Sequence, residues 1–180
     1  KMRDMGNSTV NVIGLGYIGL PTAMMMASHG VPVIGTDYNH GLLEKLQAGQ
    51  LTFREDGLEE LFQKARAGEI RFSPEYSKEA DIYIVSVPTP YDKKSKRIDP
   101  SYVISAVNQV LKVCPKGATI VVESTVSPGT MDKYVRPLLK EQGLQAGEDV
   151  HLAHAPERII PGNMVYELRH NPRTIGADNR

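Results

Sequence analysis

The chain has 180 residues, which is enough for one well-buried domain and short for two. Its 21 basic residues balance its 21 acidic residues and it has no Trp, so charge and composition argue against a nucleic-acid partner. No apolar run approaches the roughly 20 residues of a membrane span, and KMRDMGNS has no apolar signal-peptide core. The single cysteine cannot form an internal disulfide, and these features together predict a cytoplasmic domain without a membrane partner.

Seven short apolar stretches are expected to form strands, and several are β-rich on both faces, as in a parallel sheet covered by helices. In chain order they are 9–14, 31–37, 70–73, 81–87, 118–124, 150–155 and 173–177. Residues 1–8 are expected to be a disordered or tag-like N-terminus, and residues 88–99 an irregular loop. The folded domain is therefore expected to span residues 9–180.

Helical stretches with recognisable start signals lie between these strands. Asp56, with Glu59 three residues later, is expected to cap a helix in GLEELFQKARAG. Two further helices are expected to begin at Asp99 and at Ser127, where each capping side chain precedes a proline. The alternation predicts a single-domain, doubly wound α/β fold with a mainly parallel sheet and helices on both faces.

The first strand runs into a glycine loop, GLGYIG at 14–19, which is a complete G-x-G-x-x-G. In a strand–loop–helix unit, one glycine permits the tight turn, the next lets the backbone approach a diphosphate, and the third lets the helix pack on the strand. The helix N-terminus adds free N–H groups and a partial positive charge. Gly14, Gly16, Tyr17, Ile18 and Gly19 are therefore expected to bind a dinucleotide. The alternative is a plain strand–helix turn in another α/β protein.

An acidic residue stands where a ribose contact is expected. Asp37 ends the second predicted strand, 18 residues after Gly19, close to the usual offset of about 20 residues. Its carboxylate is expected to accept hydrogen bonds from the adenosine 2′- and 3′-hydroxyls and to repel a 2′-phosphate. The cofactor is therefore predicted to be NAD rather than NADP, in a Rossmann-type fold.

Polar residues follow three later strands at the edge where ligands of α/β sheets lie. SVPTP (86–90) places Val87, Pro88 and Thr89 there, and ESTVSPGT (123–130) adds Ser124 and Thr125. We expect these residues to contact the cofactor, with Thr125 holding the nicotinamide region or orienting a water molecule. An ordinary proline-rich exit loop is the alternative for the first stretch.

HAPERIIPG (154–162) places a carboxylate and a guanidinium at the same edge. Glu157 could act as a general base through water, although a surface ion pair with Arg158 explains both residues without chemistry. His151 and His154 are three apart on a predicted strand, so their side chains are expected on opposite faces. No metal site is predicted.

Five ordered motifs make the chain similar to a known family. GLGYIGLPTA, Asp37, VPTP, ESTVSPGT and APERIIPGN resemble the NAD-binding domain of the UDP-glucose/GDP-mannose dehydrogenase family, the nucleotide-sugar 6-dehydrogenases, from Thr9 to about Ala177. PERIIPGN looks more like the UDP-N-acetylmannosamine dehydrogenases of that family than the UDP-glucose dehydrogenases, which usually carry a PEF variant. The resemblance implies that two NAD molecules oxidise the C6 alcohol of a UDP-sugar to a carboxylate, through a cysteine thioester.

Carried over residue by residue, the resemblance gives roles to several positions. Thr89 and Ser124 match cofactor contacts, Thr125 matches the threonine that helps position a catalytic water, and Glu157 matches the carboxylate implicated in thioester hydrolysis. Arg158 is implied on the substrate side. The family's usual arginine after the ribose acid has no match in DYNHGLLEK.

The family's nucleophilic cysteine lies beyond its first domain, on a central helix and a second domain that this chain does not contain. Cys114, which ends a predicted helix before a proline, is interpreted as a packing residue. The chain alone is therefore expected to bind NAD without turnover, with a homodimer expected for the full-length parent. Alternatives are a stand-alone NAD-sensing module, a UDP-glucose 6-dehydrogenase as the parent, and a 3-hydroxyacid-type dehydrogenase, which APERIIPGN disfavours.

Overall fold

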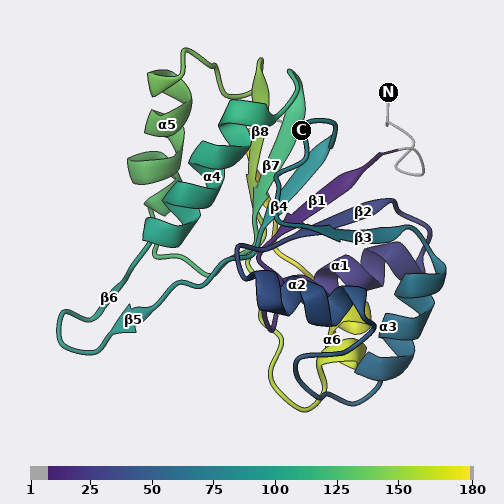
Figure 1. The fold of residues 1–180 in the computed structure, drawn as a ribbon. Helices are drawn as coiled ribbons and strands as arrows, with labels where there is room; N and C mark the ends of the chain where they lie inside the picture. The colour runs from purple at the N-terminus through teal and green to yellow at the C-terminus, as the bar shows by residue number, and fades with distance from the viewer. Residues whose placement is uncertain (1–7, 179–180) are drawn as a thin grey trace.

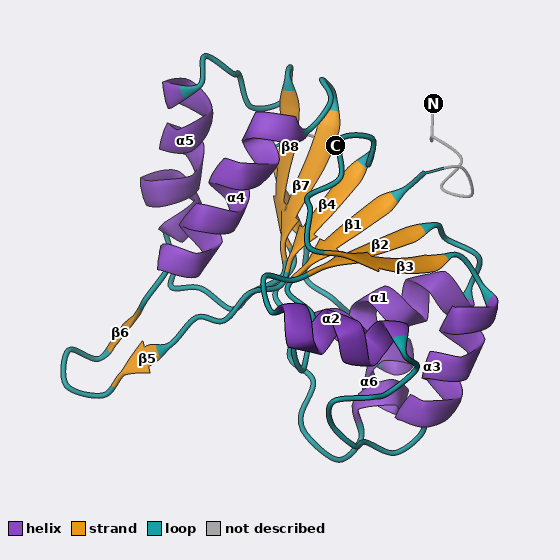
Figure 2. Ribbon diagram, in the orientation of Figure 1, coloured by secondary structure: helices purple, strands orange, loops and turns teal. Residues whose placement is uncertain are grey.

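Most strands of the described chain assemble edge to edge into one twisted sheet (Figures 1 and 2). The computed structural model describes residues 8–178, and the predicted N-terminal tail lies outside them except for Ser8, which is buried. Within these residues, seven strands follow the order β3-β2-β1-β4-β7-β8-β9. They are β1 (Val10–Ile13), β2 (Val33–Thr36), β3 (Ile70–Ser73), β4 (Ile82–Val85), β7 (Ala118–Val122), β8 (Val150–His154) and β9 (Gly176–Ala177).

All neighbouring strands pair in parallel except β9, which runs antiparallel to β8 at one edge of the sheet. The strand order reverses beside β1: β2 and β3 lie on one side of it, and β4 and the later strands on the other. In open α/β sheets this reversal places the carboxyl end of β1 in the crevice where ligands bind.

Helices cover both faces of the sheet, as Figure 2 shows. One face carries α1 (Gly19–Ser28), α2 (His40–Gln47), α3 (Leu58–Ala67) and α6 (Met164–His170). The opposite face carries α4 (Ser101–Val113), the π-helical segment η2 (Met131–Val135) and α5 (Arg136–Glu141). None of the helices within 8–178 is long and apolar enough to cross a membrane. The predicted doubly wound α/β fold is confirmed.

Strand periodicity explains why two separate cores form. Along β1, Val12 packs into the cluster under α1 and α3, whereas Ile13 packs into the cluster under α4. Along β4, Ile84 and Tyr83 divide in the same way. Successive side chains of a strand point to opposite faces, so strands that are apolar at every position must be covered twice. The sheet is therefore buried on both sides, which gives the rim of its strand ends a rigid support.

The element boundaries differ from the predictions at several helix starts. α3 is capped by Gly57, with φ of +75°, rather than by Asp56, and no side-chain cap hydrogen bond forms there. The helix after SPG begins at Thr130, so Ser127 contributes a carbonyl to the turn rather than a side-chain cap. Asp99 does accept a hydrogen bond from the Ser101 N–H at the start of α4.

One hairpin and two helices were not anticipated by the sequence patterns. The loop 88–99 contains a hairpin of two short strands, β5 (Tyr91–Asp92) and β6 (Arg97–Ile98), which projects from the body of the molecule in Figure 1. Helices α2 and α6 also form in stretches for which no helix was predicted. The predicted strand 173–177 is reduced to the two residues of β9.

Tyr83 gives the α4 face a measurable pH dependence. Its side chain is fully buried, and its O–H donates to the Ser77 carbonyl at 2.7 Å. Burial, helped by the nearby Cys114 thiol, raises the pKa of Tyr83 to about 12 from 10.0. The pKa of Tyr83 is higher in the folded chain than in the unfolded chain. Its contribution to the free energy of unfolding is therefore fully present below pH about 10 and is lost as the pH rises toward 12.

We therefore expect the urea midpoint of unfolding to decrease between these pH values. A Tyr83→Phe variant should be less stable at neutral pH, by about 1 kcal/mol for the lost hydrogen bond, and should lose part of this alkaline decrease. An alkaline decrease as steep in Tyr83→Phe as in the natural chain would show that other groups cause it.

Candidate dinucleotide-binding site

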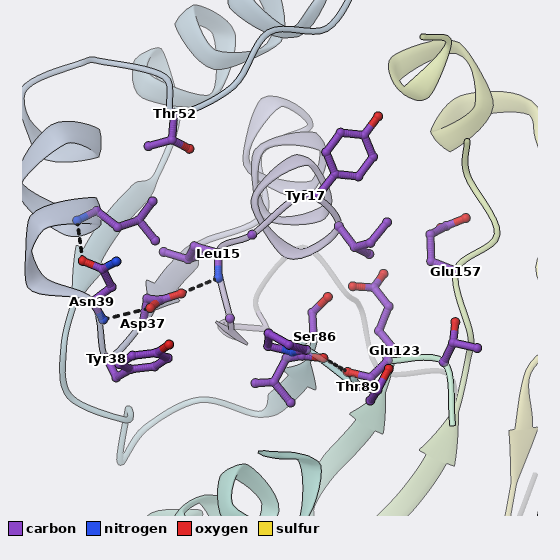
Figure 3. Close-up of a pocket in the computed structure, with 18 residues that line it drawn as sticks. Leu15, Tyr17, Asp37, Tyr38, Asn39, Thr52, Ser86, Thr89, Glu123 and Glu157 are labelled. Carbon is purple, nitrogen blue, oxygen red and sulfur yellow. Dashed lines mark hydrogen bonds between the residues drawn. The ribbon is translucent and has the colours of Figure 1, made fainter. Parts of the chain in front are cut away.

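A cavity of about 470 Å³ opens at the carboxyl ends of the central strands, where the strand order reverses. Most of the residues lining it come from the ends of β1, β2, β4, β7 and β8, and Leu42 of α2 and Thr52 after α2 complete the wall (Figure 3). They are Gly14, Leu15, Gly16, Tyr17, Ile18, Asp37, Tyr38, Asn39, Leu42, Thr52, Ser86, Val87, Pro88, Thr89, Glu123, Ser124, Thr125 and Glu157. Segments far apart in the sequence thus meet around one space.

Two of the three loop glycines are explained by the fold itself. Gly14 has φ of +90°, and a Cβ there would clash with the Ser86 carbonyl of the neighbouring strand end. A Cβ at Gly19, the first residue of α1, would clash with the Gly14 carbonyl. The chain therefore needs glycine at both positions to make the tight turn and to seat the helix on the strand.

Gly16 has no such explanation within the chain. A Cβ placed on it meets no atom within 4 Å, and its φ is not positive. It is exposed on the cavity wall, at the N-terminal end of α1. Room for a side chain here is room for a ligand, and the helix N-terminus supplies N–H groups and a partial positive charge to a diphosphate. The loop therefore fits the phosphates of a dinucleotide.

Asp37 extends from the end of β2 to the glycine loop (Figure 3). Its Oδ2 accepts a hydrogen bond from the Leu15 N–H at 2.9 Å, and its Oδ1 accepts one from the Asn39 N–H at 2.9 Å. A carboxylate oxygen can accept two hydrogen bonds, so both oxygens keep capacity for the vicinal hydroxyls of a ribose. Asp37 therefore has a structural role in the loop in addition to its predicted ribose contact.

The ends of β4 and β7 hold each other in place beside the loop. Ser124 donates its hydroxyl hydrogen bond to the Val87 carbonyl at 2.7 Å, which fixes the segment that carries Pro88 and Thr89. Thr125 is exposed at the cavity. The Ser124 side chain therefore positions the wall of the cavity.

Two carboxylates of the cavity wall, Glu123 and Glu157, share one guanidinium. Arg173 contacts two carboxylates at once, pairing with Glu123 at 2.8 Å and with Glu157. The Glu123 side chain is 0% exposed and that of Glu157 is 6% exposed. Glu123 also accepts a hydrogen bond from the Thr22 hydroxyl of α1 at 2.9 Å. Two carboxylates with one guanidinium leave this end of the cavity with net negative charge.

A further carboxylate, that of Glu55, joins the two sides of the site. Glu55 accepts a hydrogen bond from the Tyr17 hydroxyl at 2.5 Å and others from the Gly162 N–H at 2.8 and 3.1 Å. Desolvation and the Glu55 carboxylate raise the pKa of Tyr17 to about 12, which keeps its hydroxyl protonated as the donor. Glu55 therefore ties the glycine loop to the segment that follows Glu157.

The structure brings most of the predicted site residues to the cavity wall, with two exceptions. Gly19 lies behind the loop, packed against Gly14. The exposed Arg158 is not part of the wall, and its guanidinium donates to the Pro172 carbonyl at 3.2 Å. Sequence reasoning missed Glu123, although a charged residue at the end of an apolar strand was a usable signal. It also missed Tyr38, Asn39, Thr52 and the bridging Arg173.

A second cavity of about 320 Å³ adjoins the first on the other side of Gly14 and Asp37. Aromatic and small residues line it, among them Tyr76, Tyr102 and Ala106. The space is suited to a planar base next to the proposed ribose contact. Within the described part of the chain, no three His, Cys, Asp or Glu side chains are grouped so that they could hold a metal ion.

Cys114 lies at the end of α4, away from the cavity, and packs against the α4 cluster. Burial raises the pKa of its thiol, which disfavours the reactive thiolate. These observations support the interpretation of Cys114 as a packing residue.

Comparison with known proteins identifies close relatives of this arrangement. The model of the UDP-glucose/GDP-mannose dehydrogenase family, NAD binding domain, matches residues 8–180. The UDP-N-acetyl-D-mannosamine dehydrogenase of Methanococcus aeolicus is 41% identical over 183 residues, which cover 100% of this chain and 41% of that protein. The chain thus spans about two fifths of this relative's length.

Solved structures give the same result. The UDP-N-acetyl-mannosamine dehydrogenase Cap5O from Staphylococcus aureus matches with a TM-score of 0.90 at 43% identity, over 96% of this chain and 42% of that one. A ternary complex of GDP-mannose dehydrogenase from Pseudomonas aeruginosa matches with a TM-score of 0.84 at 26% identity, over 93% of this chain and 40% of that one. The similarity covers nearly the whole of this chain in both cases.

Proposed function

The chain belongs to the UDP-glucose/GDP-mannose dehydrogenase family, in which it matches the NAD-binding domain, and we propose that it is the cofactor-binding part of an enzyme that oxidises the C6 alcohol of a UDP-sugar. NAD, when bound, accepts the hydride from the alcohol carbon. Oxidation to the carboxylate requires two such transfers and therefore two NAD molecules. The observation that carries the cofactor part of the proposal is the open, unconstrained Gly16 beside the Asp37 carboxylate.

We assign the cofactor contacts along the cavity from one end to the other. Asp37 accepts hydrogen bonds from the adenosine ribose, and the Gly16 backbone with the start of α1 binds the diphosphate. Val87, Pro88 and Thr89 form the wall beside the second nucleoside, and Ser124 fixes that wall. The adenine base occupies the adjoining aromatic cavity.

The proposed chemical roles fall to the far end of the cavity. Thr125 positions a water molecule, and Glu157, whose carboxylate lies almost buried beside Arg173, takes a proton from that water as the thioester is hydrolysed. The nucleophilic cysteine and most of the UDP contacts belong to segments that this chain does not contain. Arg158 is proposed on the substrate side, where its exposed side chain is directed toward Pro172.

UDP-N-acetylmannosamine is the proposed sugar substrate. PERIIPGN at 156–163 and the 41% identity to a UDP-N-acetyl-D-mannosamine dehydrogenase support it over UDP-glucose. A stand-alone NAD sensor is disfavoured because a sensor needs no buried carboxylate like Glu157 at the cofactor cavity.

The 180-residue chain is expected to bind one NAD per molecule in a calorimetric titration and to produce no NADH with UDP-N-acetylmannosamine, because it lacks the nucleophile. NADH fluorescence measures the second result. A longer protein that continues into the cysteine-bearing domain is the positive control. Steady NADH formation by the 180-residue chain would mean that the nucleophile lies within it, and failure to bind NAD would refute the proposed cofactor site.

A further inference from the structure

Glu123 is a buried carboxylate with one oxygen left over. Its Oε1 accepts hydrogen bonds from the Thr22 hydroxyl and the Arg173 guanidinium. Its Oε2 is buried and has no hydrogen-bond partner among the described residues. A buried, unsatisfied charged acceptor is costly, and a native protein keeps one where a partner outside the chain satisfies it. The orphaned oxygen therefore indicates a ligand.

The position of Glu123 restricts which part of a ligand can reach it. Figure 3 shows its carboxylate between Ser86 and Glu157, at the end of the cavity opposite Asp37 and Asn39. If Asp37 holds the adenosine ribose, as proposed above, the nicotinamide half of the dinucleotide extends toward Glu123. This step rests on the proposed function.

The chemistry of Glu123 restricts the ligand group further. Arg173 forms an ion pair with Glu123, and the hydrogen bonds from Arg173 and Thr22 both end on Oε1, so the lone pairs of Oε2 remain available to accept. Its partner must be a donor. The carboxamide of the nicotinamide ring carries an NH2 group that projects from the ring edge.

We propose that Glu123 Oε2 accepts a hydrogen bond from the nicotinamide carboxamide and so fixes which face of the ring is presented to the substrate. The hydrogen bonds from Thr22 and Arg173 hold Oε1 in place. The carboxylate therefore cannot rotate, and only Oε2 can meet the ring. Glu123 is therefore a specificity-determining residue for the cofactor, and Arg173 is a positioning residue that couples it to Glu157.

A cofactor analogue provides the direct test. In 3-acetylpyridine adenine dinucleotide a methyl group replaces the carboxamide NH2, while the ribose and diphosphate are unchanged. The natural chain is expected to bind this analogue on the order of tenfold more weakly than NAD in calorimetry, as a hydrogen bond to a charged group is lost. ADP-ribose, which lacks the ring, reports on the rest of the site.

A Glu123→Gln variant is expected to abolish this discrimination. Arg173 and Thr22 hold the glutamine oxygen where Oε1 lies, which places the amide NH2 at the orphaned position. That NH2 can donate to the carbonyl of either cofactor, so the ratio of the two dissociation constants should approach one, with ADP-ribose affinity unchanged. Glu141→Gln, at the exposed end of α5, is the charge-matched control and should keep the natural ratio.

Three outcomes would overturn the inference. Equal affinity of the natural chain for NAD and the analogue would do so without any variant. The natural ratio persisting in Glu123→Gln, with NAD affinity also unchanged, would assign the discrimination to another residue. Equal weakening of both dinucleotides in that variant would assign the orphaned oxygen to a ribose hydroxyl instead. Loss of ADP-ribose binding by the natural chain would instead refute the proposed cofactor site as a whole.

Discussion

Replacing Gly16 with valine is expected to abolish NAD binding while the chain still folds. The side chain would enter open space, since no atom lies within 4 Å of the added Cβ, and the backbone φ does not require glycine. That space is where the diphosphate meets the backbone amides of the loop. Losing two or more charge-assisted hydrogen bonds weakens binding on the order of 100-fold or more. Calorimetry measures the binding, and thermal unfolding measures the stability.

Two other glycines make the Gly16→Val result interpretable. Gly176 in β9 also has open space around an added Cβ, so Gly176→Val should keep both its NAD affinity and its unfolding midpoint. Gly19→Val should unfold or strongly destabilise the chain, because its side chain would collide with the Gly14 carbonyl. If Gly16→Val bound NAD as tightly as the natural chain does, the loop would be a turn and nothing more.

Replacing Asp37 with alanine is expected to weaken NAD binding on the order of 1.5–3 kcal/mol, the value of hydrogen bonds to a charged group. The variant also removes the acceptor of the Leu15 and Asn39 N–H groups, so the glycine loop loses a support. Asp37→Asn keeps one of these acceptors and the side-chain volume. It should therefore lose less stability than Asp37→Ala does.

NADP distinguishes the ribose contact from the loop support. The natural chain should bind NADP far more weakly than NAD, because the Asp37 carboxylate repels a 2′-phosphate. Both Asp37 variants should narrow that preference, and a change in loop support alone would leave it intact. Unchanged NAD affinity in Asp37→Ala would show that Asp37 makes no contact with the ribose.

The sequence was sufficient for the fold because its signals were local and repeated. Strands that are apolar on both faces, such as IYIV at 82–85, require helices on both sides, and GLGYIG indicates the first strand–helix turn. Helix starts were harder to predict. Asp56 and Ser127 have capping chemistry, but the backbone turns at Gly57 and Thr130 instead, where packing and φ decide the boundary.

The site was predictable where it follows strand ends and not where it depends on distant partners. Thr89, Thr125 and Glu157 come within two residues of the ends of predicted strands, so their convergence follows from the parallel sheet. The pairing of Glu123 with Arg173 joins residues 50 positions apart. No local pattern specifies such a contact, which depends on where the β8–β9 connection passes over the end of β7.

Glu55 gives the molecule a mechanical property that neither loop has alone. Its carboxylate joins Tyr17, 38 residues before it, to Gly162, 107 residues after it. The turn at the mouth of α1 and the stretch behind Glu157 are therefore held by one shared carboxylate. The backbone amide of Gly162 donates to Glu55 and should exchange its hydrogen with solvent more slowly when a bound dinucleotide rigidifies the turn. Hydrogen exchange at this amide would then report binding of the phosphates at the glycine loop.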